Sequence, residues 1–195
     1  MWIVIVRIVL LLLFLAVAWL LFKRRKMFKK KIVVVLAILF LVGLWWALAI
    51  FPIENFFITF KSPQSAFYYT QMGQIEGILY GNDSCMIITK GSYSFVLKSA
   101  YGYKITNPFS VRHISHFFAR DFDVYNISGT NDYYVVGSAI SKDDSVNIYN
   151  NSGELVGVFK TYEANSPFYF AYVNGFSKDD YALINGEKVF MTKQP

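Results

Sequence analysis

The residues best suited to chemistry are two histidines and two aspartates in the middle of the chain. His113 and His116 are the only histidines, and Asp121 and Asp123 follow them closely. Imidazole nitrogens and carboxylate oxygens bind zinc, and they also act as bases and acids in hydrolases. On a helix, the two histidines would share a face and could bind zinc together with an aspartate. On a strand, residues three apart point to opposite faces. The surroundings favour a strand or an irregular loop, so we predict no metal site.

Three pairs of aspartates partly match the pattern of a calcium-binding loop. Asp121-x-Asp123 begins like an EF-hand loop, but tyrosine and asparagine occupy the positions where the motif requires an oxygen ligand and then glycine. Asp143-Asp144 and Asp179-Asp180 could each offer carboxylates to calcium at a loop tip. Such pairs are more often solvated turns, so we predict no cofactor.

Motifs of the large enzyme classes are absent from the sequence. It contains no G-x-S-x-G, no P-loop, no dinucleotide-binding glycine pattern and no H-E-x-x-H. Ser84 stands beside the single cysteine, Cys85, but neither has a histidine near it in sequence. We therefore predict no catalytic residue. The alternative is an exported hydrolase whose site is assembled from the dispersed residues His113, His116, Asp121 and Asp123.

A basic run near the start of the chain decides on which side of a membrane these residues would lie. Seven of the nine residues at 23–31 (KRRKMFKKK) are Lys or Arg, and apolar stretches flank them at 1–22 and 32–52. About twenty helical residues cross a hydrocarbon core of about 30 Å. The first stretch carries one charge, Arg7, and the second carries none. We therefore predict two transmembrane helices, at 1–22 and 32–52.

The basic run also predicts the orientation in the membrane. Lys and Arg in a short loop hold that loop in the cytoplasm. We expect 23–31 to be a cytoplasmic loop of the plasma membrane anchor, with the N-terminus and an extracytoplasmic domain at 53–195 outside. The four Trp, at positions 2, 19, 45 and 46, lie near the ends of the stretches, where indole rings prefer the interface.

A second interpretation treats the later apolar stretch as a signal sequence. Met27, the lysines after it and the apolar residues have that layout, and Ala47-Leu48-Ala49 has the form of a cleavage site. The stretch is longer than the usual signal core of about 7–15 residues. Bulky Trp45 and Trp46 also lie close to the site. Retention is favoured, and the domain is exported under either interpretation.

The net charge of +6 does not indicate a nucleic-acid-binding protein. Residues 1–52 hold eight of the nineteen basic residues and no acidic one. Residues 53–195 hold eleven basic and thirteen acidic residues. The excess positive charge therefore lies in the predicted membrane anchor, where it sets the orientation, and no nucleic acid is expected as a partner.

The exported part is predicted to be mainly β, with one short helix. All fourteen Tyr lie there, and aromatic residues favour strands. Ser62-Pro63 suits a helix start and predicts a helix over Ser62–Met72, with Gly73 as its stop. Cys85 is the only cysteine, so the domain must be stabilised by packing without an internal disulfide.

Turn residues divide the rest of the domain into short segments. Ser84–Lys90 and Ser92–Lys98 flank Gly91 and predict a hairpin, and Asn185-Gly186 predicts another. About ten segments of this kind are typical of an antiparallel sandwich or a barrel-like sheet.

The plan of the chain resembles that of small membrane-anchored proteins of Gram-positive bacteria. A basic stub and an apolar anchor precede a TF-x-SP-x-x-AF stretch, here Thr59–Phe67, and a β-rich tail follows. The resemblance covers this general layout and the one short motif, and it implies no activity or site.

We predict a membrane-anchored protein that presents its domain as a non-catalytic binding, interaction or sensor-accessory module. The nine-residue loop is too short to be a signalling domain, so a signal would pass through the helices of a partner. Arg7 or Gly43 could mark contact with another membrane or cell-surface protein. Snorkelling of Arg7 to the headgroups and ordinary helix composition explain these residues more simply.

Overall fold

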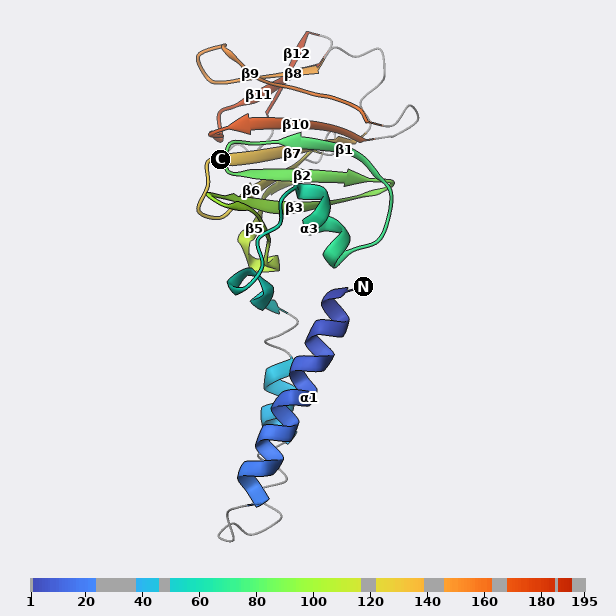
Figure 1. Ribbon diagram of the computed structural model, residues 1–195. Helices are drawn as coiled ribbons and strands as arrows, with labels where there is room; N and C mark the ends of the chain where they lie inside the picture. Colours follow the sequence, from blue (N-terminus) through green and yellow to red (C-terminus); the bar gives the residue numbers. More distant parts are fainter. Residues whose placement is uncertain are drawn as a thin grey trace.

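The chain forms a β-rich domain with apolar helical segments extending from one end. The computed structural model describes residues 2–23, 38–45, 50–116, 122–138, 146–162, 168–184 and 186–190. Helix α1 (Trp2–Lys23) leads away from the domain, and a helical segment at 38–45 lies beside it (Figure 1). The rings of Phe14 and Phe40 stack there with centroids 4.8 Å apart. Over the residues that the structure describes in full, no helix combines the length and apolar character needed to cross a membrane.

Short helical elements open the domain. The 3-10 helix η1 (Ile53–Phe56) precedes α3 (Pro63–Thr70), which confirms the predicted short helix. Ser62 Oγ accepts a hydrogen bond from the Ser65 backbone N–H at 3.2 Å, so Ser62 is the N-cap. The helix ends before Gly73 because the backbone is already extended at Gln71. A second 3-10 helix, η2 (Pro108–Ser110), follows later.

Twelve strands in the described residues form three antiparallel sheets of four strands each. The first sheet has the order β1-β2-β3-β4: β1 (Ile75–Tyr80), β2 (Ser84–Thr89), β3 (Ser92–Ser99) and β4 (Gly102–Ile105). The second has the order β10-β7-β6-β5: β10 (Phe168–Asn174), β7 (Asp132–Ser138), β6 (Phe122–Ile127) and β5 (Val111–His116). The third has the order β12-β11-β8-β9: β12 (Glu187–Phe190), β11 (Tyr181–Ile184), β8 (Val146–Tyr149) and β9 (Leu155–Val158).

The sheets pack face to face because apolar side chains alternate along each strand. In β2, Ile87 packs in the cluster with α3, while Met86 packs against the second sheet. In β7, Tyr134 packs toward the first sheet and Val135 toward the third. The mainly-β class is confirmed. Where the sequence predicted a sandwich or barrel-like sheet, the structure has a stack of three sheets with α3 on the outer face of the first.

Candidate functional site

Two of the four hydrolase candidates lie together on an edge of the second sheet. His113 Nε2 on β5 is 2.8 Å from Asp123 Oδ1 on β6, and the His113 ring stacks on Tyr125 with centroids 5.0 Å apart. The two side chains are 44% and 29% exposed, so the pair is open to solvent. Asp121 lies outside the described residues, and only the backbone of His116 is described.

A β-bulge in β5 changes the expected relation between the two histidines. His113 pairs with Tyr125 and His116 pairs with Asp123, and the register shifts between His113 and Ser115. Tyr125 and Asp123 are two residues apart on β6 and share a face. The segment is a strand, one of the two alternatives that the sequence left open. The bulge adds one residue between the two histidines, so the backbone register there departs from the simple alternation that the sequence analysis assumed.

A histidine held by an aspartate forms the base half of many hydrolase sites. The nucleophile types noted in the sequence, Ser84 and Cys85, lie instead in the core of the first sheet, 0% and 1% exposed. Burial raises the pKa of the Cys85 thiol to about 11, which disfavours the reactive thiolate. Within the described part of the chain, no three His, Cys, Asp or Glu side chains gather closely enough to hold a metal ion.

The most buried polar site centres on a residue that the sequence did not single out, Asp132. Its carboxylate, on β7, accepts hydrogen bonds from the backbone N–H groups of Asn82 and Asp83 at 3.1 and 2.8 Å. It also accepts from the hydroxyls of Ser84 and Tyr172 at 2.6 and 2.8 Å. Asp132 therefore ties the β1–β2 turn of the first sheet to two strands of the second.

The Asp132 network is closed to ligands by close packing. A Cβ on Gly81 would lie 2.6 Å from both Asp132 Oδ2 and the Tyr134 hydroxyl, so only glycine fits there. Burial raises the pKa of Tyr172 to about 12, with the hydrogen bond to Asp132 as the next cause. Tyr134, whose hydroxyl is 2.9 Å from Ser84 Oγ, also has a raised pKa, because it is buried. The hydroxyls stay protonated at neutral pH, and the network acts as a structural clamp.

The paired aspartates predicted at turns have different outcomes. Asp143-Asp144 lies outside the described residues. Asp180 is buried, and its carboxylate accepts a hydrogen bond from the Ser177 backbone N–H at 2.8 Å. Burial raises the pKa of Asp180. Its carboxylate therefore closes the turn before β11, unlike the solvated pair that the sequence predicted.

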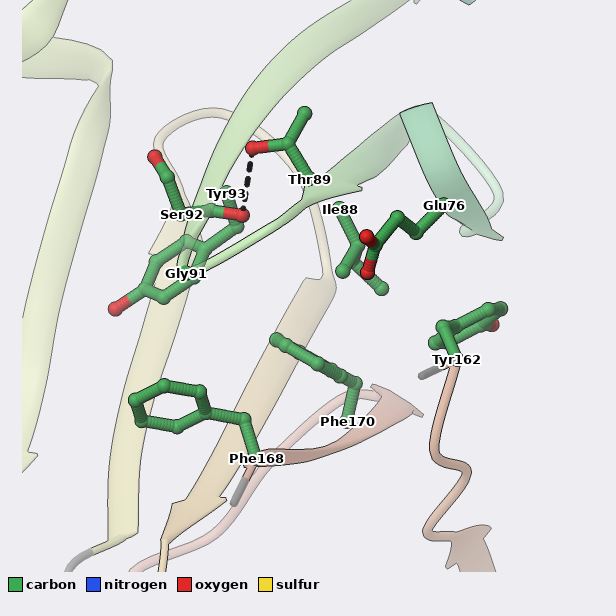
Figure 2. A pocket seen from close by; sticks show the side chains of 9 residues that line it. All are labelled: Glu76, Ile88, Thr89, Gly91, Ser92, Tyr93, Tyr162, Phe168 and Phe170. Carbon is green, nitrogen blue, oxygen red and sulfur yellow. Dashed lines mark hydrogen bonds between the residues drawn. The ribbon is translucent and has the colours of Figure 1, made fainter. Parts of the chain in front are cut away.

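A narrow cleft opens between the first and second sheets (Figure 2). Its volume is about 30 Å³, which admits about one water molecule. Tyr93, Tyr162, Phe168 and Phe170 form an aromatic wall, and Glu76 of β1 supplies one carboxylate. A carboxylate beside aromatic rings attracts organic cations. At this size, the cleft accommodates only the tip of such a group.

The wall of this cleft depends on a glycine in β1. A Cβ on Gly77 would lie 1.9 Å from Cδ1 of the Tyr162 ring, whose centroid is 6.1 Å from that of Phe170. We expect Gly77→Ala to push Tyr162 off the sheet and to lower the free energy of unfolding by about 1–3 kcal/mol, as overpacking does. Urea unfolding of the full chain in detergent measures this loss.

The double variant Gly77→Ala/Tyr162→Ala is the control for that prediction. Removing the ring also removes the clash, so the loss for the double variant should be smaller than the sum of the two single losses. Strict additivity would show that Tyr162 does not pack on Gly77.

A cavity of about 300 Å³ lies at the end of the domain from which α1 extends. It is lined by α1, by the segment before η1, by α3 and by the first sheet, and its wall includes Arg7, Phe67, Thr70, Phe95 and Thr106. Most of its lining residues are apolar, and Thr70, Ser94 and Thr106 carry hydroxyl groups.

Arg7 is paired within its own chain at this cavity. Its Nε is 3.0 Å from Glu54 Oε1, and its Nη2 is 3.3 Å from Oε2. Glu54 is 3% exposed, so its charge is balanced mainly by this guanidinium. Gly43, the other residue named as a possible helix contact, has no described heavy atom within 4 Å of where a Cβ would lie.

Comparison with family models, with curated proteins and with solved structures finds no significant match to this chain.

Proposed function

We propose that the chain is a membrane-anchored protein whose two apolar helices hold a β-rich, non-catalytic binding module at the outer face of the plasma membrane. The observation that carries the proposal is the ion pair between Arg7 and Glu54, which joins the first apolar helix to the domain. The Glu54 side chain is 1% exposed. The helix and the domain therefore meet at a buried contact, as a surface-bound domain requires.

The apolar surface of the helical segments supports anchoring. Leu12 and Leu13 of α1 are 58% and 59% exposed, and Leu39 and Val42 are each 63% exposed. Side chains of this kind gain by contact with lipid tails, whereas contiguous apolar surface is rare on soluble monomers. The basic run at 23–31 favours the cytoplasmic side for the loop, and so the outer side for the domain.

Protease added to intact protoplasts tests this topology. We expect digestion of 53–195 and protection of the basic loop at 23–31. A domain that is protected in intact protoplasts, but cut after lysis, would contradict the proposal.

The hydrolase remains a second candidate because His113 and Asp123 form a solvent-open pair at 2.8 Å. Substitution separates the two functions. We expect His113→Ala, His116→Ala and Asp123→Ala to preserve folding, partner capture by crosslinking in intact cells, and the cellular phenotype. An exposed pair of this kind stabilises a fold by at most about 1 kcal/mol.

Glu187→Ala, which removes an exposed carboxylate on β12, is the matched control. Loss of the phenotype in the histidine or Asp123 variants, with folding and capture intact and the control unaffected, would favour the hydrolase.

A further inference from the structure

The segment that begins the domain buries its polar side chains and exposes its aromatic ones. Glu54 is 3% exposed, whereas Phe56 and Phe57 are 85% and 87% exposed. Asn55 donates to the Ile105 carbonyl at 2.7 Å and accepts from the Ile105 N–H at 2.9 Å. This pattern reverses the usual preference for burying phenylalanine. The polar contacts fix η1 on both sides, so they hold the two rings outside the core.

Two more exposed phenylalanines belong to the same end of the domain. Phe51 is 50% exposed just before η1, and Phe109 in η2 is 65% exposed. Pro52 and Pro108, the neighbours of these two residues in sequence, line the same cavity, so the two segments lie close together. We call the set Phe51, Phe56, Phe57 and Phe109 the aromatic base.

The position of α1 indicates what faces the aromatic base. Arg7 lies near the start of α1 and contacts Glu54, which is two residues before Phe56. Figure 1 shows α1 leading away from this end of the domain. A bilayer that contains α1 would therefore have its surface at the level of the aromatic base. Exposed phenylalanine rings can bury their apolar area at the boundary between the headgroups and the acyl chains of such a surface.

We propose that the aromatic base inserts into the outer headgroup region of the bilayer and docks the domain on the membrane. This inference rests on the proposed anchoring and adds the residues that contact lipid. The ligand is the lipid surface itself, and the driving force is the removal of the exposed rings from water. Docking keeps the opposite end of the domain, with the third sheet, directed away from the membrane.

Site-specific labels on the full chain in vesicles test this docking. The chain carries Cys85→Ala and one new cysteine, labelled with bimane, in vesicles of phosphatidylcholine and phosphatidylglycerol. The new cysteine is Phe57→Cys in the aromatic base, Leu155→Cys as a control or Leu12→Cys in α1. Leu155 is a suitable control because it is also apolar and is 55% exposed, on β9 of the third sheet, at the end of the domain away from α1 (Figure 1).

We expect lipids with a nitroxide near the headgroup to quench the label at position 57, and aqueous iodide to quench it several-fold less than the label at position 155. The label at position 12 should be quenched by lipid nitroxide and shielded from iodide. Adding Phe56→Ser and Phe109→Ser should raise iodide quenching at position 57, whereas adding Tyr68→Ser, an exposed residue of α3, should not.

Two outcomes would overturn the proposal and can be told apart. If position 12 is shielded by lipid while iodide quenches position 57 as strongly as position 155, the docking is wrong and the anchor stands. If iodide also reaches position 12, the proposed anchoring fails and the docking fails with it. Because the vesicles contain only this chain, shielding at position 57 cannot come from another kind of protein.

Discussion

Replacement of Asp132 by alanine is expected to lower the free energy of unfolding of the domain by about 3–5 kcal/mol. The side chain is fully buried and accepts four hydrogen bonds. Its removal takes the acceptor from the Asp83 N–H and the Tyr172 hydroxyl, and each buried donor left unpaired costs about 1–3 kcal/mol. The other two donors keep a partner, because the Asn82 N–H also lies 3.2 Å from the Tyr172 hydroxyl and Ser84 Oγ lies 2.9 Å from the Tyr134 hydroxyl. Part of this cost is recovered because the turn at Asn82 is exposed and can reach water.

Pulse proteolysis of the full chain in detergent, over a series of urea concentrations, measures the loss. Asp132→Asn keeps the size of the side chain but only one acceptor oxygen. Its free energy of unfolding should therefore lie between that of Asp132→Ala and that of the unchanged chain. Asp83→Ala removes an exposed carboxylate from the same turn and should change stability by less than about 0.5 kcal/mol. Equal, small effects for Asp132→Ala and Asp83→Ala would show that the network does not hold the sheets.

Most of the strands were predictable because their signals are local, whereas the stretch that forms β5 (Val111–His116) had no clear pattern. Around Gly91, alternation predicts Ser84–Lys90 and Ser92–Lys98, and the structure has β2 and β3 within a residue of these bounds. The turn needs a residue with positive φ, and Gly91 has φ +71°. The helix at Ser62 was predictable for the same reason, since its cap and its proline are adjacent in sequence.

The stacking of the sheets was not predictable from the same patterns. Strand β10 follows β8 and β9 in sequence but pairs with β7, so the third sheet is interrupted by a strand of the second. The alternation of side chains along a strand shows that the strand has two different faces, but it does not show which sheet covers each face. In this domain β6, β7 and β10 of the middle sheet bury both faces, and each face packs on a different neighbour.

The candidate sites depend on contacts that no local pattern contains. Asp132 follows an asparagine and looks like an ordinary turn residue, yet its partners in the β1–β2 turn lie about 50 residues earlier. The relation of His113 to His116 depends on a bulge, which the alternation rule assumes to be absent. Glu54 was not singled out in the sequence, although a carboxylate close to an apolar segment needs a partner and Arg7 is the one charge in the first apolar stretch.

Substitution of Arg7 by glutamine is expected to loosen the junction between α1 and the domain. It leaves the carboxylate of Glu54 buried without its cation, and breaking a buried pair in this way costs about 3 kcal/mol or more. The amides of Phe57 and Ile58 donate to the Glu54 carbonyl and report on η1. Their hydrogen exchange, measured by mass spectrometry in vesicles, should accelerate about a hundredfold, because each 1.4 kcal/mol corresponds to about a factor of ten. Lys61→Gln removes an exposed positive charge nearby in sequence and should leave that exchange unchanged.

The double variant Arg7→Gln/Glu54→Gln decides whether the effect comes from the pair. In this variant both charges are gone, so no carboxylate is buried without a cation. The side-chain amides of the two new glutamines can hydrogen-bond to each other. We expect exchange in the double variant to be slower than in Arg7→Gln alone, because the main cost is the unpaired charge and not the loss of an attraction. The single variant Glu54→Gln completes the comparison. If the acceleration of exchange in the double variant equals the product of the accelerations in the two single variants, the residues act independently. The first apolar helix would then not be fixed to the domain through Glu54, and the contact that carries the proposed anchoring would be lost.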